Sequence, residues 1–189
     1  MDIVSTQQQE KIHPQLFILW VAIASIIMMF AGLTSAYIVK SNQEGWQTLA
    51  MPQVFFISTA AILGSSLTLH LAISSFKKEV MSRYRLLLGL TVLLGIIFVI
   101  LQVIGFQQIW NSGIQLKGVA GAGQFLYVIF GLHGLHVVGG IVALIVMALK
   151  TLFSKSKITP KTPIEVMATY WHFVDLLWVY ILLFFIWIQ

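Results

Sequence analysis

Five ionisable side chains lie within long apolar runs of this sequence, where they could do chemistry. One run ends the chain and contains a carboxylate three residues after an imidazole, and another contains two imidazoles three residues apart. An ionisable group at membrane depth is costly and is therefore a candidate functional residue. The set is His70, His133, His136, His172 and Asp175.

Three kinds of chemistry fit these types and spacings. A haem b site needs two imidazoles from different helices at similar depth, and His70 and His172 are the best candidates. A proton relay would use Asp175 with the histidines, although one carboxylate is few for a pump. A structural role needs only that Asp175 and His172 form a local polar pair, which lowers the cost of burying either group. The spacing alone favours the structural role.

Aromatic residues surround the acid. Trp171, Trp178 and Trp187 could be residues of an interfacial belt. Trp178 lies well inside the last apolar run, however, three residues after Asp175 and on the same face. We expect this run to pack against protein on several sides.

The composition indicates which elements position these groups. The chain has 189 residues, of which 59% are hydrophobic and only 9% are charged, whereas about a quarter of a soluble domain is charged. It is therefore predicted to be an integral membrane protein. Because it has no cysteine, disulfides, thiolate-bound metals and iron–sulfur clusters within the chain are excluded.

Five apolar runs are long enough to cross a bilayer, which takes about 20 residues per helix. They predict an all-α bundle of five transmembrane helices in one domain, residues 16–189, after a cytoplasmic segment, residues 1–15. Residues 154–163 are expected to be a solvated connection. The predicted helices cover residues 16–38, 54–76, 86–109, 125–149 and 169–188.

Basic residues are sorted by connection. The N-terminal segment, the second connection and the fourth together hold nine of the 11 lysines and arginines, and Lys40 and Lys117 lie on the opposite side. The positive-inside rule places the N-terminus in the cytoplasm and the C-terminus outside.

Small residues spaced four apart predict close helix packing, because they let two backbones approach each other in lipid. The pairs are Ala60 with Gly64, Ala61 with Ser65, and Gly139 with Ala143.

Two ordered motifs resemble subunit III of the haem–copper respiratory oxidases, the cytochrome c oxidase family. They are GLHGLHVVGG, residues 131–140, and YWHFVDLLWVYIL, residues 170–182. Weaker similarity covers residues 65–72 and 93–102. The family's long form has seven helices, so five helices imply a short form without the first two.

The resemblance implies a non-catalytic subunit without a redox cofactor, the haems and copper being held by partner subunits. It implies direct packing against oxidase subunit I, association with subunit II, phospholipid binding, and support of proton uptake and of stability during turnover. Membership of a larger respiratory supercomplex is left open. The expected location is the bacterial cytoplasmic (inner) membrane.

Residues that match the family's motifs form the predicted lipid or subunit interface. The family usually has a glutamate three residues after the matching glutamine, where this chain has Gly105, so the resemblance does not carry a proton-active role to this position. The predicted interface residues are Gln102, His133, His136, Tyr170, Trp171, His172, Asp175 and Trp178.

Alternatives remain at this point. A subunit III of a quinol-oxidising enzyme would have the same architecture, because the electron donor binds to other subunits. A haem b membrane anchor would use His70 and His172. A transporter is less favoured, since no inverted repeat or pair of broken helices is visible.

Overall fold

The computed structural model describes residues 14–41, 51–111, 122–153 and 161–188. These residues form an all-α bundle, as predicted, and each helix is long and apolar enough to cross a membrane. Most of the predicted cytoplasmic segment, residues 1–13, lies outside the described residues. The helices are α1 (Pro14–Ser41), α2 (Val54–Lys77), α3 (Met81–Asn111), α4 (Ala122–Phe153) and α5 (Lys161–Trp187).

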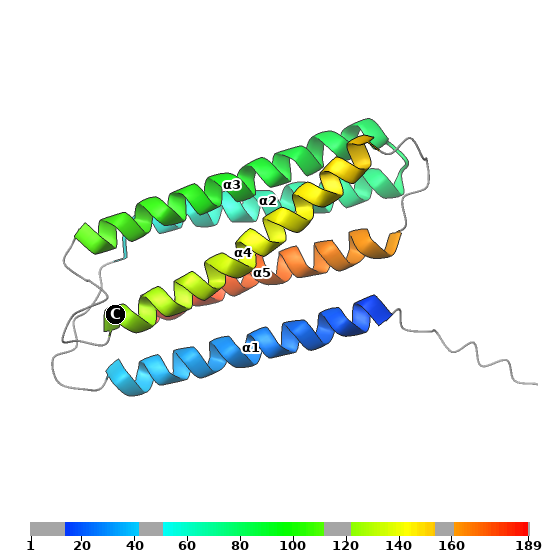
Figure 1. The fold of residues 1–189 in the computed structure, drawn as a ribbon. Helices are drawn as coiled ribbons and strands as arrows, with labels where there is room; N and C mark the ends of the chain where they lie inside the picture. Colours follow the sequence, from blue (N-terminus) through cyan, green and yellow to red (C-terminus); the bar gives the residue numbers. More distant parts are fainter. Residues whose placement is uncertain (1–13, 42–50, 112–121, 154–160, 189) are drawn as a thin grey trace, which may run out of the picture.

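Successive helices run in opposite directions along one bundle axis (Figure 1). Helices α2 and α3 have the most extensive mutual packing, α3 also packs on α4, and α5 lies against both α2 and α4. Among the described residues, the backbone of α1 neighbours only α4 and α5. The bundle therefore has a four-helix body with α1 attached along one side.

A tight turn explains why α2 and α3 are such close neighbours. The N–H of Val80 donates to the Ser75 carbonyl and the N–H of Glu79 donates to the Phe76 carbonyl, both at 3.0 Å. This is the Schellman arrangement that ends a helix on a left-handed residue. Glu79 has that conformation, with φ of 61°, so α3 starts within four residues of the end of α2.

Helix α5 begins at Lys161, eight residues before the predicted start at residue 169. A proline is tolerated in the first turn of a helix, where its missing N–H has no partner to lose, and Pro163 occupies that turn. Ile164 and Met167 are buried and continue the packed face of the helix. The sequence prediction of a connection that reaches residue 163 is therefore wrong.

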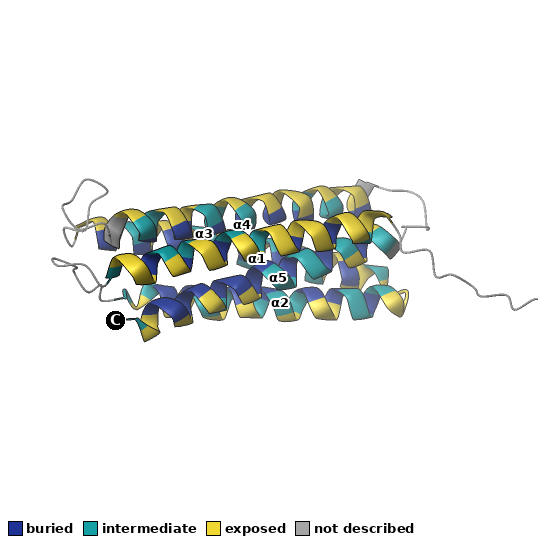
Figure 2. Cartoon of the chain, turned by 90° about the horizontal axis from the view of Figure 1, so that it is seen from below, coloured by how far each residue is buried: buried dark blue, intermediate teal, exposed yellow. Residues whose placement is uncertain are grey.

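The outer surface of the bundle is apolar and its buried residues face inward (Figure 2). Met28, Leu135 and Leu176 are each more than two-thirds exposed, which suits contact with lipid. Lys77, Lys78 and Lys150 lie at one end of the bundle, where α2 and α4 end, and Lys40 lies at the other, where α1 ends.

The small residues have mixed roles. A Cβ at Gly64 would meet a Leu94 methyl at an ordinary 3.8 Å, and Ser65 is fully buried, so this part of α2 does face other helices. Gly139 and Ala143, in contrast, are exposed. They do not bring α4 close to another described helix, and that part of the packing prediction is wrong.

Candidate polar site in the bundle interior

Trp171 fixes α5 against α2 and α3. Its indole N–H donates to the Ser65 hydroxyl oxygen at 3.1 Å, and the Ser65 hydroxyl donates to the Thr91 carbonyl at 3.3 Å. Trp171 and Ser65 are fully buried. Three helices are thereby joined through one serine.

Two glycines make room for the Trp171 ring. A Cβ added at Gly140 of α4 would lie 2.9 Å from Trp171 Cζ3, and one at Gly95 of α3 would lie 3.1 Å from Cη2. The ring is therefore held between the bare backbones of α3 and α4. The large Trp171 ring fits here because neither glycine has a side chain.

Trp178 has the same role two turns further along α5. Its indole N–H donates to the Thr59 hydroxyl at 2.9 Å. Its ring contacts those of Phe98, Phe130 and His133, with centroids 5.2 to 5.4 Å apart. Trp178 is fully buried, whereas Trp187 is 79% exposed, so only the latter suits the interfacial belt.

Gln102 is buried on α3 and its amide donates to the Ser58 hydroxyl of α2 at 3.0 Å. One turn later, a Cβ at Gly105 would lie 2.7 Å from the Phe55 ring. Phe55 is fully buried and also contacts Phe106. Aromatic packing thus fills the space that a longer side chain at position 105 would need.

The two histidines of α4 differ in their surroundings. His133 is 1% exposed, and neither of its ring nitrogens has a hydrogen-bond partner. Its ring lies among Phe30, Phe98 and Trp178. His136 is half-buried, and its Nδ1 is 2.7 Å from the Leu132 carbonyl, which can only accept, so Nδ1 is the donor.

Tyr170 connects α5 to this region of α4. Its hydroxyl donates to the backbone carbonyl of His136 at 3.1 Å. Tyr170, Trp171 and Trp178, all predicted interface residues of α5, therefore hold this helix to α4 and α2.

His172 and Asp175 do not form the predicted pair. The Nδ1 atom of His172 is hydrogen-bonded to the Ser66 hydroxyl of α2 at 2.6 Å. Asp175 is only 3% exposed, and neither of its carboxyl oxygens has a hydrogen-bond partner. The sequence prediction of a satisfied local pair is wrong, because His172 bonds to a serine of α2 and neither carboxyl oxygen of Asp175 has a partner.

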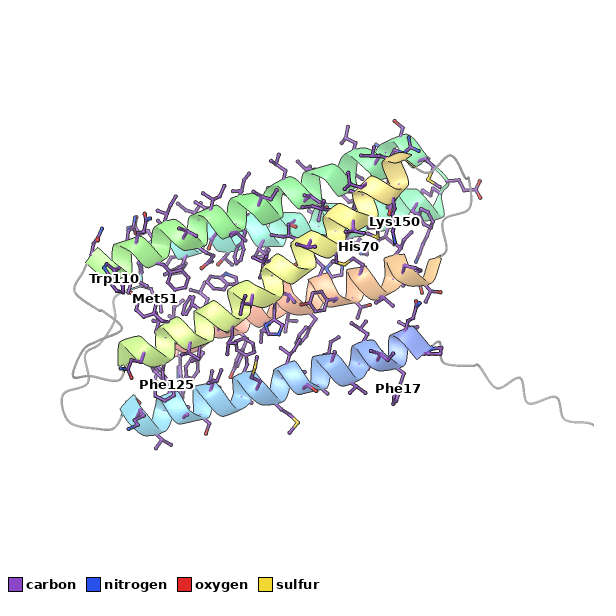
Figure 3. The ribbon with its side chains drawn as sticks, in the orientation of Figure 1. Phe17, Met51, His70, Trp110, Phe125 and Lys150 are labelled. Atoms are coloured by element: carbon purple, nitrogen blue, oxygen red, sulfur yellow. The ribbon has the colours of Figure 1, made fainter. Side chains whose placement is uncertain are left out.

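His70 is exposed on α2, one turn after Ser66, in the half of the bundle nearer Lys150 (Figure 3). Ser66, one turn earlier on α2, is the residue that is hydrogen-bonded to His172. Within the described ranges, no three His, Asp or Glu side chains are grouped so that they could hold a metal ion. The polar side chains described above therefore form hydrogen bonds between helices, and Asp175 is left without one.

The hydroxyl partners on α2 were not identified from the sequence. Ser58 and Ser65 are seven residues apart, and so are Thr59 and Ser66. A spacing of seven residues is about two helical turns, so each pair lies along one face. This repeat of small hydroxyl residues was the available signal, since such side chains form hydrogen bonds between membrane helices.

Comparison with known proteins agrees with this arrangement. The family model described as cytochrome c oxidase subunit III matches residues 15–189. The chain belongs to the cytochrome c oxidase subunit III family.

Curated relatives carry the same description. The chain is 30% identical over 167 residues to the probable cytochrome c oxidase subunit 3 of Nocardia farcinica, covering 86% of this chain and 81% of the relative. It is 30% identical to cytochrome c oxidase subunit 3 of Bacillus sp. PS3 over 166 residues, with 86% and 80% covered. The Bacillus subtilis protein of that name is 28% identical over 167 residues, with the same coverage.

Membership of the cytochrome c oxidase subunit III family makes this chain a multi-pass membrane protein and a non-catalytic member of an oxidase complex with other subunits. The family's two motifs lie on α4 and α5. In this chain the tryptophans of the second motif donate to hydroxyls of α2. The motif residues therefore stabilise the bundle itself.

Proposed function

We propose that this chain is the accessory subunit III of a proton-pumping haem–copper terminal oxidase, a cytochrome c oxidase that reduces oxygen to water in aerobic respiration. In this role it supports the assembly, lipid binding and turnover stability of subunit I. One observation carries the proposal: Tyr170, Trp171 and Trp178 make contacts between helices of this chain. A rigid, packed bundle suits a scaffold.

The proposed partners are oxidase subunit I, in direct contact, and subunit II, with a respiratory supercomplex as a larger assembly in which the oxidase could take part. The basic end of the bundle would face the cytoplasm of a bacterial inner membrane, with the N-terminus on that side. The basic connections there would attract anionic phospholipid headgroups. Haems and copper would be held by the partner subunits.

The names of the relatives favour cytochrome c as the electron donor of the complex, and the quinol-oxidising form is the second candidate. A haem b anchor through His70 and His172 is less favoured. His172 is already hydrogen-bonded to Ser66, and the chain belongs to a family of non-catalytic subunits.

Deleting the chain from its host tests the scaffold role. We expect the oxidase core purified from the deletion strain to keep its haem spectrum and initial oxygen consumption, and to lose activity faster during continuous turnover. Complementation with the wild-type gene should restore the lifetime. Loss of the haem bands from a correctly composed core, or an unchanged turnover lifetime without the chain, would contradict the proposal.

A further inference from the structure

Asp175 is the buried acid of the bundle. The structure describes three acidic residues, and two of them, Glu79 and Glu165, are exposed. Asp175 is 3% exposed and lies in the middle of α5. The lysine of α5 is Lys161, the first residue of the helix and 14 positions before Asp175, so α5 places no lysine or arginine near this carboxyl group.

The carboxyl group also lacks a partner on neighbouring helices. Neither of its oxygens accepts a hydrogen bond, and both ring nitrogens of the buried His133 are likewise without hydrogen-bond partners. His136 bonds to Leu132 instead. An ionised carboxylate with no donor is very costly inside a membrane protein, whereas the neutral acid is much less so.

Polar side chains lie between Asp175 and the basic end of the bundle, where Lys77 and Lys150 lie. Asp175 lies on α5 between two contacts with α2: the hydrogen bond of His172 Nδ1 to the Ser66 hydroxyl at 2.6 Å, one turn before it, and the hydrogen bond of Trp178 to Thr59, one turn after it. The carboxyl group therefore shares the contact between α2 and α5 with Ser66. His70 lies one turn beyond Ser66 on α2 and is exposed. His70 and His172 both lie on the side of Asp175 where α2 ends and α5 begins.

We propose that Asp175 is a proton-exchanging site, reached from the basic end of the bundle through His70, His172 and Ser66. A hydroxyl can accept one hydrogen bond while donating another, so Ser66 can connect the imidazole and the carboxyl group. The ligand of the site is a proton taken from water at the surface. This inference goes beyond the scaffold role and does not depend on it.

Each transfer is balanced. The neutral acid loses its proton by the reverse of the following steps. In the uptake direction, a hydronium ion on the side of His70 gives a proton to His172 Nε2; its O–H bond breaks to leave water, and His172 becomes an imidazolium. Its Nδ1–H bond then breaks as that proton moves to the Ser66 oxygen, while the Ser66 hydroxyl proton forms an O–H bond with the Asp175 carboxylate. The imidazole and the serine end neutral, the carboxyl group ends protonated, and no group is oxidised or reduced.

Infrared difference spectroscopy of the full chain, purified with the subunits that accompany it, tests the proposal. The C=O stretching band of a protonated carboxylic acid should be present in the wild type and absent in Asp175→Asn. In Asp175→Glu the band should move, which identifies its source even if the asparagine variant fails to assemble. A spectrum in which neither substitution changes a carboxylic acid band would overturn the proposal.

The route is tested by transferring the sample into heavy water and timing the shift of the same band. Positioned acid–base groups typically accelerate proton transfer by about 10²-fold or more, so Ser66→Ala and His172→Phe should slow the exchange by a factor of that order. Ser75→Ala is the matched control, because Ser75 is also buried on α2 but bonds to the Leu71 carbonyl. Exchange as fast in both route variants as in this control would show that the route is wrong.

These spectra measure the protonation of a carboxyl group and do not depend on oxidase activity, so the two proposals can fail separately. A chain that purifies without haem-containing partners but keeps the Asp175 band would contradict the proposed function and support the proton site. A normal complex without that band would do the reverse.

Discussion

At the scale of single residues, the histidines and the acid of this chain differ from one another more than their spacing suggested. His133 and Asp175 are buried without hydrogen-bond partners, while His136 and His172 each use Nδ1 in a hydrogen bond. Trp171 and Trp178, which could have been surface anchors, join helices, whereas Trp187 is exposed. A buried polar group without a partner costs stability, whereas a hydrogen-bonded one contributes to it. Replacing His133 and replacing Trp178 should therefore change the stability of the bundle in different ways.

Replacing His133 with leucine removes two unpaired nitrogens from an aromatic pocket. We expect the thermal unfolding temperature of the purified chain to stay unchanged or rise, because an apolar side chain of similar size can replace a buried polar group at no cost. Trp178→Phe should instead destabilise the bundle by at least about 0.6 kcal/mol, the average measured for a hydrogen bond between membrane helices, where the maximum is about 1.7 kcal/mol. Trp187→Phe is its exposed control. A large loss of stability in His133→Leu would show that His133 has a partner after all.

At the scale of helices, close approach depends on which side of a glycine faces the bundle. Gly139 and Gly140 are neighbours on α4, but a Cβ at Gly139 would meet nothing within 4 Å, whereas one at Gly140 would meet both Trp171 and Tyr170. The sequence pattern selected Gly139 for packing because it lies four residues before Ala143. The structure shows Gly140 in that role, one residue and about 100° further around the helix.

This difference gives a matched pair of variants. Gly140→Ala should destabilise the chain by about 1 to 3 kcal/mol, the usual cost of inserting a methyl group into a packed interior. Gly139→Ala should leave the free energy of unfolding nearly unchanged or slightly improved, since alanine favours the helix. Both are measured by denaturation in the same detergent. Equal effects of the two variants would mean that the Trp171 ring can move aside.

The sequence predicted the existence and type of all five helices because long apolar runs and base-rich connections are strong signals in membrane proteins. It missed the first eight residues of α5, where polar residues such as Glu165 hid a helix that still buries Ile164. Pairing in the interior was harder to predict. Only the fold shows that Ser66, distant in sequence, is the hydrogen-bond partner of His172.

At the scale of the whole molecule, the orientation of the chain in the membrane decides from which side a proton would reach Asp175. Because the chain has no cysteine, single cysteines report accessibility without background. We expect Lys40→Cys to react with a membrane-impermeant thiol reagent in intact cells, and Lys78→Cys to react only after permeabilisation. The reverse pattern would place the basic end, and the entrance beside His70, on the outer side of the membrane.

We propose above that this member of the cytochrome c oxidase subunit III family is a cofactor-free bundle that serves an oxidase core. The most direct measurement is a reduced-minus-oxidised visible spectrum of the complex purified through a tag on this chain, repeated on the chain after its partners are removed. We predict haem bands of a terminal oxidase in the complex and none in the isolated chain. A b-type band that stays with the isolated chain would contradict the account and make His70 and His172 candidate haem ligands.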